Sequence, residues 1–230
     1  MQFVLVLAFD TATAAVTVAL YEWSPGEGAV RRGGVEAVDR RRHTELLTPA
    51  IAQTLAEAGA APQDLHAIAV GVGPGPYTGL RVGLVTARAM GDALKIPVHG
   101  VCTLDIIAWE SRREEPFVVA TDARRKEVYW ARYETAAVRA TDPAVGPPSD
   151  VLAGQPADLP VIGEGAALYP EVLGARDREP RPLLPSAGAL AELVVTRLSG
   201  APGPGLLPPE PLYLRRPDAR EPGPRKRVSQ

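Results

Sequence analysis

Residues 71–84 read GVGPGPYTGLRVGL, a glycine- and proline-rich turn between an apolar run and a helix-forming stretch. The apolar run before it ends in AIAV and predicts a buried strand. A glycine-rich turn between a strand and a helix often holds a phosphate, because backbone N–H groups and the helix dipole face it. The turn therefore poses the first question of function, which is whether this chain binds a nucleotide or shapes a surface.

The turn departs from both common nucleotide-binding patterns. A P-loop ends in lysine followed by serine or threonine, whereas Leu80, Arg81 and Val82 stand in that region here. The pattern G-x-G-x-x-G fails as well, since its third glycine position holds Pro76 or Thr78, depending on the register. Nucleotide binding is therefore the weaker interpretation, and a stiff turn that orients the following helix is the stronger one.

The composition limits the classes of protein that fit. The chain has 230 residues, of which 46% are hydrophobic, enough for one large domain or two small ones. The single cysteine, Cys102, allows no intramolecular disulfide. The start, MQFVLVLAFD, reads as a buried strand and not as a signal peptide, so we expect a cytoplasmic protein. Residues 215–230 carry a net charge of +4 and the rest −6; a solvated tail is expected, with a phosphate contact as the alternative.

Hydrophobic periodicity predicts three strands near the start of the chain, followed by helices alternating with strands. The first two helices are expected at about 44–58 and 79–94, the second with Thr78 as its N-cap. Pro49 either follows an N-cap at Thr48 or bends a longer helix. The second half predicts a hairpin over 116–134 and a later helix. This order indicates an α/β fold with mixed sheets in two lobes.

The helix after the turn carries a small residue at every fourth position: Gly79, Gly83, Ala87 and Gly91. Glycine inside a helix costs about 1 kcal/mol relative to alanine, so a line of glycines needs a compensating gain. A strip without side chains lets another backbone approach closely, and Leu80 and Leu84 form an apolar stripe beside it. Both faces are available either to the chain's own sheet or to a partner, and periodicity alone does not decide between them.

Five segments together resemble the TsaB family, the dimerisation subunit of the bacterial tRNA threonylcarbamoyladenosine synthase: LAFDTATAAVTVAL, HTELLTPAI, VGVGPGPYTGLRVGLVTARAMG, GVCTLDIIA and PLYLR. The resemblance covers roughly residues 3–112, with a further match near 211–215. It implies an actin-like or sugar-kinase (ribonuclease-H-like) fold with a reduced second lobe. The expected division is therefore 1–104 for the N-terminal lobe with the partner-binding helices, 105–216 for a smaller C-terminal lobe, and 217–230 for a disordered basic tail.

The resemblance also implies a partner and a place for it. In this family the first two helices of the N-terminal lobe pair with the equivalent helices of the catalytic subunit, TsaD, which gives a small four-helix interface. The residues expected at this interface are Leu47, Ile51, Leu55, Leu80, Gly83, Leu84, Ala87 and Gly91. The ATPase TsaE and tRNA are expected to be reached through the complex, and no membrane is involved. For the isolated chain a homodimer is an open alternative.

The resemblance bears on metals and nucleotides as well. TsaD carries a metal-binding histidine pair with HxxxH spacing, and Thr103 and Ile107 occupy the corresponding positions here. We therefore expect no metal site and no catalytic residue. In sugar kinases the acid that ends the first strand contacts magnesium and phosphate. Asp10, with Thr11 and Thr13, is thus the candidate for a residual nucleotide contact, and a turn-capping aspartate is the alternative. ATP or ADP is expected to bind only weakly or within the complex.

The predicted function is a non-catalytic scaffold subunit that is not active alone. Its complex would transfer a threonylcarbamoyl group to the exocyclic amine of the adenosine next to the anticodon, in tRNAs that read codons beginning with A. The alternative is an independent ATP-dependent kinase or ATPase of the same fold. Such an enzyme needs a second phosphate loop, for which Gly163-Glu164-Gly165 is the only candidate and a short one.

Overall fold

The computed structural model describes residues 3–25, 28–154, 156, 159–173, 181–200 and 205–215. The predicted disordered tail, 217–230, lies outside the described residues. Within the described residues, no helix is long and apolar enough to cross a bilayer.

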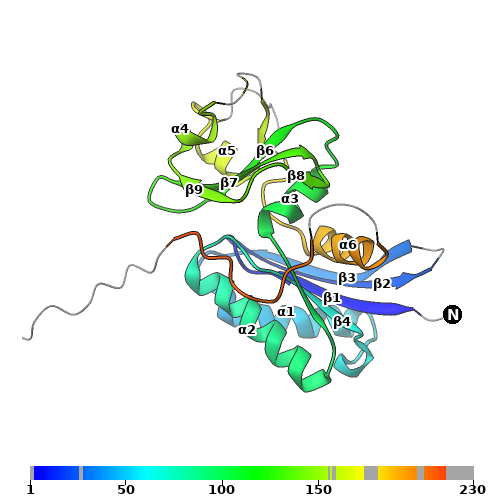
Figure 1. The fold of residues 1–230 in the computed structure, drawn as a ribbon. Helices are drawn as coiled ribbons and strands as arrows, with labels where there is room; N and C mark the ends of the chain where they lie inside the picture. Colours follow the sequence, from blue (N-terminus) through cyan, green and yellow to red (C-terminus); the bar gives the residue numbers. More distant parts are fainter. Residues whose placement is uncertain are drawn as a thin grey trace, which may run out of the picture.

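The first lobe is built on a five-stranded mixed sheet (Figure 1). Its strands in chain order are β1 (Val4–Asp10), β2 (Ala15–Ser24), β3 (Gly28–Val38), β4 (Ala67–Gly71) and β5 (Val98–Val101). In space the order is β3-β2-β1-β4-β5; β2 pairs antiparallel with β1 and β3, whereas β4 runs parallel to β1 and β5. The central β1 is covered on both faces, which explains why its sequence is one continuous apolar run.

Helices cover both faces of this sheet (Figure 1). On one face lie α1 (His43–Glu57) and α2 (Tyr77–Leu94), and on the other lies α6 (Ala187–Leu198). Side chains of β1 alternate between the two: Leu7 and Phe9 join the core under α1 and α2, and Val6 and Ala8 join the core under α6. The first two helices are thus fixed to the sheet by their apolar stripes.

The second lobe has a smaller, weaker sheet. Its strands are β6 (Phe117–Asp122), β7 (Val128–Thr135), β8 (Val138–Arg139), β9 (Ala144–Gly146) and β10 (Val161–Ile162), in the order β10-β6-β7-β8 with β9 also on β7. Only short helices, α4 (Pro148–Val151) and α5 (Glu164–Leu168), accompany them. A longer helix, α3 (Thr103–Ser111), connects the lobes: Ile106 joins the core under α6, and Ile107 joins the core of the second lobe, which we call the second core.

These two mixed sheets, the second reduced, confirm the predicted fold class, and the order of the first sheet is that of a ribonuclease-H-like lobe. The division at residue 104 stays a prediction. Two segments that it assigned to the C-terminal lobe contact the first lobe: α6 and the stretch 205–215, which we call the C-terminal strap and which contacts the second lobe as well. The strap pairs with β5, since the N–H groups of Gly100 and Leu207 each donate to the other's carbonyl oxygen, at 2.8 and 2.9 Å.

Helix starts differ from the sequence-based expectations. α1 begins at His43, so Pro49 lies inside a longer helix, the second of the two alternatives. α2 begins at Tyr77 with Pro76 at its N-cap position, so the prediction that Thr78 caps it was wrong. Pro76 is preset to the φ that precedes the helix, and its carbonyl oxygen accepts the Leu80 N–H at 3.1 Å. α6 is capped by Ser186, whose hydroxyl oxygen accepts the Ala189 N–H at 3.1 Å.

Candidate partner-binding face

The glycine-rich turn is filled by the chain's own backbone. A side chain on Gly75 would overlap the carbonyl oxygen of Ala12, so the turn packs directly on the loop that follows β1. The Gly73 N–H donates to Thr103 Oγ1 at 3.1 Å, and the Thr103 N–H donates to the Gly73 carbonyl oxygen at 2.7 Å. The Gly73 N–H is thus engaged by a side chain of α3, and Gly75 lies against the backbone of the β1–β2 loop. The turn therefore ties α2 and α3 to the end of β1.

Asp10 is fully buried beneath this turn. Its Oδ1 accepts the Ala12 N–H at 2.7 Å, and its Oδ2 accepts the Thr103 hydroxyl at 2.8 Å. Burial raises the pKa of Asp10 to about 6, although the two hydrogen bonds and the nearby His43 lower it in part. A side chain on Gly71 would overlap this carboxylate, which accounts for a glycine at the end of β4. Both oxygens are engaged within the chain, as in the alternative of a turn-capping aspartate.

Thr11 explains part of the small-residue strip on α2. Its hydroxyl donates to the Gly79 carbonyl oxygen at 2.7 Å and accepts the Gly83 N–H at 3.0 Å, so it is inserted into the backbone ladder of the helix. A Cβ on Gly83 would lie 2.6 Å from Thr11 Oγ1. Thr13 is also buried, and its carbonyl oxygen lies 2.8 Å from His43 Nε2. Gly79 and Gly83 thus allow the β1–β2 loop to approach the helix closely. Of the two alternatives for this strip, its position agrees with a contact inside the chain.

The structure corrects the residues expected at a partner interface. All eight lie on the side of α1 and α2 that faces the sheet: Leu47, Ile51, Leu55, Leu80, Gly83, Leu84, Ala87 and Gly91. The six that carry a side chain are only 0–6% exposed. A Cβ on Gly91 would overlap the Val98 side chain, just as a Cβ on Gly83 would overlap the Thr11 hydroxyl. The apolar stripe that periodicity selected therefore belongs to the core of the chain's own lobe, because the most apolar face of a helix packs against the sheet of its own domain.

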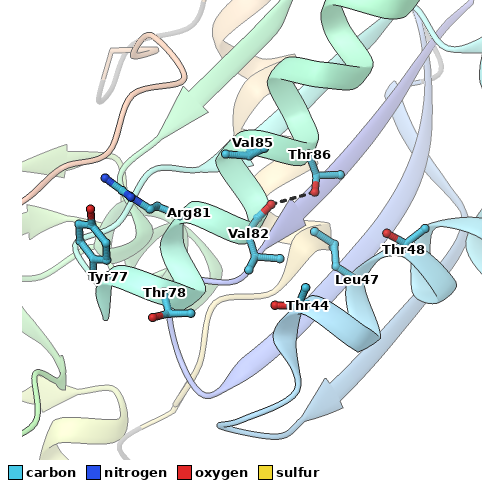
Figure 2. A pocket seen from close by; sticks show the side chains of 9 residues that line it. All are labelled: Thr44, Leu47, Thr48, Tyr77, Thr78, Arg81, Val82, Val85 and Thr86. Atoms are coloured by element: carbon cyan, nitrogen blue, oxygen red, sulfur yellow. Dashed lines mark hydrogen bonds between the residues drawn. The ribbon is translucent and has the colours of Figure 1, made fainter.

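The outward side of the same two helices carries an apolar hollow of about 450 Å³ (Figure 2). Tyr77 and Val85 on its rim are 47% and 64% exposed, and Leu47 lies at its buried floor. The full lining is Thr44, Leu47, Thr48, Tyr77, Thr78, Arg81, Val82, Val85 and Thr86, with Arg81 as its only charged residue. We call this surface the outer face. Its sequence signal is the recurrence of valine and threonine at 78, 82, 85 and 86, where an exposed helix side normally carries charges.

The C-terminal strap braces one end of the outer face. Tyr213 stacks on Tyr77 with ring centroids 5.3 Å apart, and its hydroxyl accepts the Arg81 Nε–H at 3.0 Å. The Arg81 guanidinium in turn lies 3.8 Å from the centroid of the Tyr77 ring. The late PLYLR segment thus holds two residues of the outer face in place, a contact that sequence reasoning missed because it joins positions more than 130 residues apart.

The candidate second phosphate loop is occupied as well. Glu164 Oε1 accepts Arg40 Nη2–H at 2.6 Å, so this loop is tied to the first lobe by an ion pair. Gly163, at φ 97°, packs on the Ala120 carbonyl oxygen. Across the described part of the chain, no group of three or more His, Cys, Asp or Glu side chains is placed to hold a metal ion. The hydroxyl of Thr103 is bonded to Asp10, and Ile107 is buried in the second core.

Fold and site together define a two-lobed α/β protein of the actin-like type, with a filled phosphate turn and an apolar face on its first two helices. A family model described as "TsaD: tRNA N6-adenosine threonylcarbamoyltransferase" matches residues 29–171, more than half of the chain. The chain belongs to this TsaD-type family and, within it, to the TsaB proteins.

The relatives agree with this assignment. The structure titled "YeaZ from Pseudomonas aeruginosa" matches with a TM-score of 0.72 and 31% identity, over 92% of this chain and 100% of that one. The tRNA threonylcarbamoyladenosine biosynthesis protein TsaB of Escherichia coli is 36% identical over 56% of this chain and 54% of its own length. An uncharacterized protein of Mycobacterium leprae is 44% identical over 94% of this chain. The chain spans about half the length of that protein, 56%.

Proposed function

We propose that this chain is the non-catalytic scaffold subunit of a complex that transfers a threonylcarbamoyl group to the adenosine next to the anticodon of tRNA. The observation that carries the proposal is the outer face of α1 and α2, an apolar surface on the helices that pair with the catalytic subunit in the TsaB family. The relatives named as tRNA threonylcarbamoyladenosine biosynthesis proteins supply the reaction. The chain works in the cytoplasm, where tRNA is modified.

The partner of the outer face in this proposal is the catalytic subunit, TsaD. Exposed Tyr77 and Val85 contribute apolar area, and the threonines around them can be desolvated at lower cost than charged side chains. The ATPase TsaE joins through the complex. A second copy of this chain is the competing occupant of the same face when TsaD is absent.

We further propose that the chain holds no tightly bound nucleotide or metal. The support is that Asp10 and Thr11 direct their polar atoms to Ala12, Thr103, Gly79 and Gly83, so few donors remain for a phosphate. ATP or ADP would then bind only weakly or within the complex. No observation favours the kinase alternative over this proposal.

The experiment changes Val85 to Asp in the full chain and measures its affinity for the catalytic subunit by calorimetry. Val85→Asp should leave the thermal melt unchanged, because the residue is 64% exposed. In the complex the charge would be buried without a partner, which costs several kcal/mol and lowers affinity roughly a hundredfold or more. The matched control is Val38→Asp on β3, where the valine is 63% exposed, and its affinity should equal that of the wild type.

Three results would contradict the proposal. If Val85→Asp binds the catalytic subunit as tightly as the wild type does, the interface lies elsewhere. If Val38→Asp weakens binding as much as Val85→Asp does, the effect comes from net charge alone. Stoichiometric binding of ATP by the isolated chain, with phosphate release, would favour the kinase alternative.

A further inference from the structure

Seven basic residues belong to three segments that meet at the turn between β6 and β7, where this turn contacts the first lobe. They form the basic cluster: Arg40, Arg41, Arg42, Arg124, Arg125, Lys126 and Arg215. All except Arg215 are exposed. The seven come from three segments that are far apart in the sequence: the loop before α1, the β6–β7 turn, and the end of the C-terminal strap. Figure 1 shows the orange-red strap ending between the two lobes.

Ion pairs and a hydrogen bond hold the three segments together. Arg40 Nη1 lies 3.4 Å from Asp122 Oδ2, and Arg124 Nη1 lies 3.5 Å from the same oxygen. Arg215 Nη1–H donates to the carbonyl oxygen of the next residue, Ala123, at 2.8 Å. Two consecutive residues of the second lobe therefore receive guanidinium groups from all three segments, so the cluster is one surface and not three separate runs of charge.

The cluster is positive on a protein that is otherwise acidic. Five carboxylates pair with its members or act on their charge: Asp39, Glu45, Asp122, Glu127 and Glu164. Seven cations against these five anions leave a net charge of +2, whereas residues 1–214 as a whole carry −6. Concentrating positive charge against the overall sign creates a local field that favours a polyanion.

The backbone presents the tip of the cluster in a fixed shape. Arg124, Arg125 and Lys126 all adopt left-handed φ angles, of 63°, 56° and 62°, which non-glycine residues rarely do in succession. The turn is closed by hydrogen bonds, from the Arg124 N–H to Asp122 Oδ1 at 2.8 Å and from the Glu127 N–H to the Arg124 carbonyl oxygen at 3.0 Å. Three adjacent cations are thus held on a tight turn, next to the guanidinium of Arg40.

We propose that the basic cluster binds the phosphodiester backbone of RNA directly, an inference that rests on the proposed function. Six of its seven members are arginines, whose planar fork matches phosphate oxygens bidentately. The cluster spans both lobes, as an extended polyanion requires. None of its members lines the outer face, so the two surfaces share no residue. The RNA is contacted through its phosphates, without reading of base sequence.

The test reverses two charges at the tip, Arg125→Glu with Lys126→Glu, in the full chain. The probe is a labelled tRNA transcript, and fluorescence anisotropy is measured between about 50 and 200 mM salt, the range over which phosphate contacts change affinity most clearly. The wild type should bind with a strong salt dependence. The variant should bind at least tenfold more weakly, with the slope of log K against log salt reduced by about 1.4–1.8, as expected for two lost phosphate contacts.

The matched control is Arg88→Glu with Lys95→Glu, two exposed basic residues on α2 and its C-cap. It makes the same change in net charge, keeps the basic tail, and should retain the wild-type slope. Equal losses in both variants, or a wild type that does not bind the transcript, would overturn the proposal. So would displacement of the RNA by polyglutamate of equal charge at equal concentration, which would assign the cluster to an acidic protein.

Failure here is separable from failure of the proposed function. The tip variant should still bind the catalytic subunit as the wild type does, because the outer face is unchanged. RNA binding without any affinity for the catalytic subunit would leave the cluster assigned and the scaffold role refuted. The reverse pattern would refute the cluster alone.

Discussion

The two sides of the α1–α2 pair differ in what covers them. The inner side consists of aliphatic residues such as Leu47, Ile51 and Leu80, which are buried against the sheet. The outer side mixes valine and threonine with Tyr77 and Arg81, and several of these residues are exposed. Both sides carry several apolar residues and few charges. Only the outer side is free for another protein, because the inner side is fully used by the lobe itself.

This difference shows how partner surfaces should be sought in an amphipathic helix. The most regular apolar stripe predicts the core of the helix's own domain. A partner surface is better indicated by a lack of charge on the opposite side, as at Val82, Val85 and Thr86. Three predictions test how sharply the two sides are separated.

The largest effect is expected from Ile51→Asp on the inner side. Ile51 is 6% exposed and lies in the first core, so an aspartate there would be a buried charge without a partner. The free energy of unfolding should fall by several kcal/mol, enough to unfold a chain of ordinary stability. Circular dichroism during a thermal melt measures this. Val85→Asp is the paired control, and its free energy of unfolding should lie within about 0.5 kcal/mol of the wild-type value, as for other surface substitutions. Equal stability of the two variants would show that the inner and outer sides do not differ in burial.

The next effect depends on pH and concerns Asp10, beneath the inner side. Its pKa is raised from 3.8 to about 6 by burial, so between about pH 4 and 6 the folded protein keeps a proton that the unfolded chain has released. Stability should therefore fall as pH rises through this window, by about 3 kcal/mol in all, and be level above it. Asp10→Asn, which cannot titrate, should lack this loss. Urea unfolding of both proteins from pH 4 to 8 gives the comparison, and parallel curves would show that Asp10 does not carry it.

The smallest effect is expected from Gly83→Ala. The new Cβ would lie 2.6 Å from Thr11 Oγ1 and would force that hydroxyl out of the helix ladder. Overpacking costs about 1–3 kcal/mol, and the better helix propensity of alanine returns about 1 kcal/mol, so a net loss of about 1 kcal/mol is expected. In the background of Thr11→Ala the same change should be neutral or stabilising, because the obstructing hydroxyl is gone. A loss of the same size in both backgrounds would point to a cause other than Thr11.

Much of the first lobe could be predicted from the sequence. The continuous apolar run of β1 predicts a strand buried on both faces, as observed. The helical period of α1 and α2 predicts the sides of these helices that pack on the sheet. The second lobe was harder, because strands such as β8 and β10 have two residues each and carry no periodic signal. They exist only through pairing with β6 and β7.

The partner interface stays a prediction. The residues that periodicity selected on the two helices are buried against the chain's own sheet, and the exposed apolar side of the same helices has no regular stripe in the sequence. Thr11 decides the matter, since its hydroxyl enters α2 at Gly83 from a loop more than 70 residues earlier in the chain. Such a contact leaves no local pattern. Likewise, the stack of Tyr213 on Tyr77 joins two segments that the sequence alone gives no reason to pair.

The C-terminal strap and α6 have a consequence for biosynthesis. Leu190 and Leu193 of α6 complete the core on one face of the first sheet, and Leu207 closes the edge at β5. These residues leave the ribosome long after β1 to β5 have been made. The nascent sheet therefore emerges with one face and one edge uncovered, and it offers a chaperone a hydrophobic target until α6 and the C-terminal strap have followed. Order of synthesis thus delays completion of the first lobe until two segments that come after the second lobe in the sequence have been made.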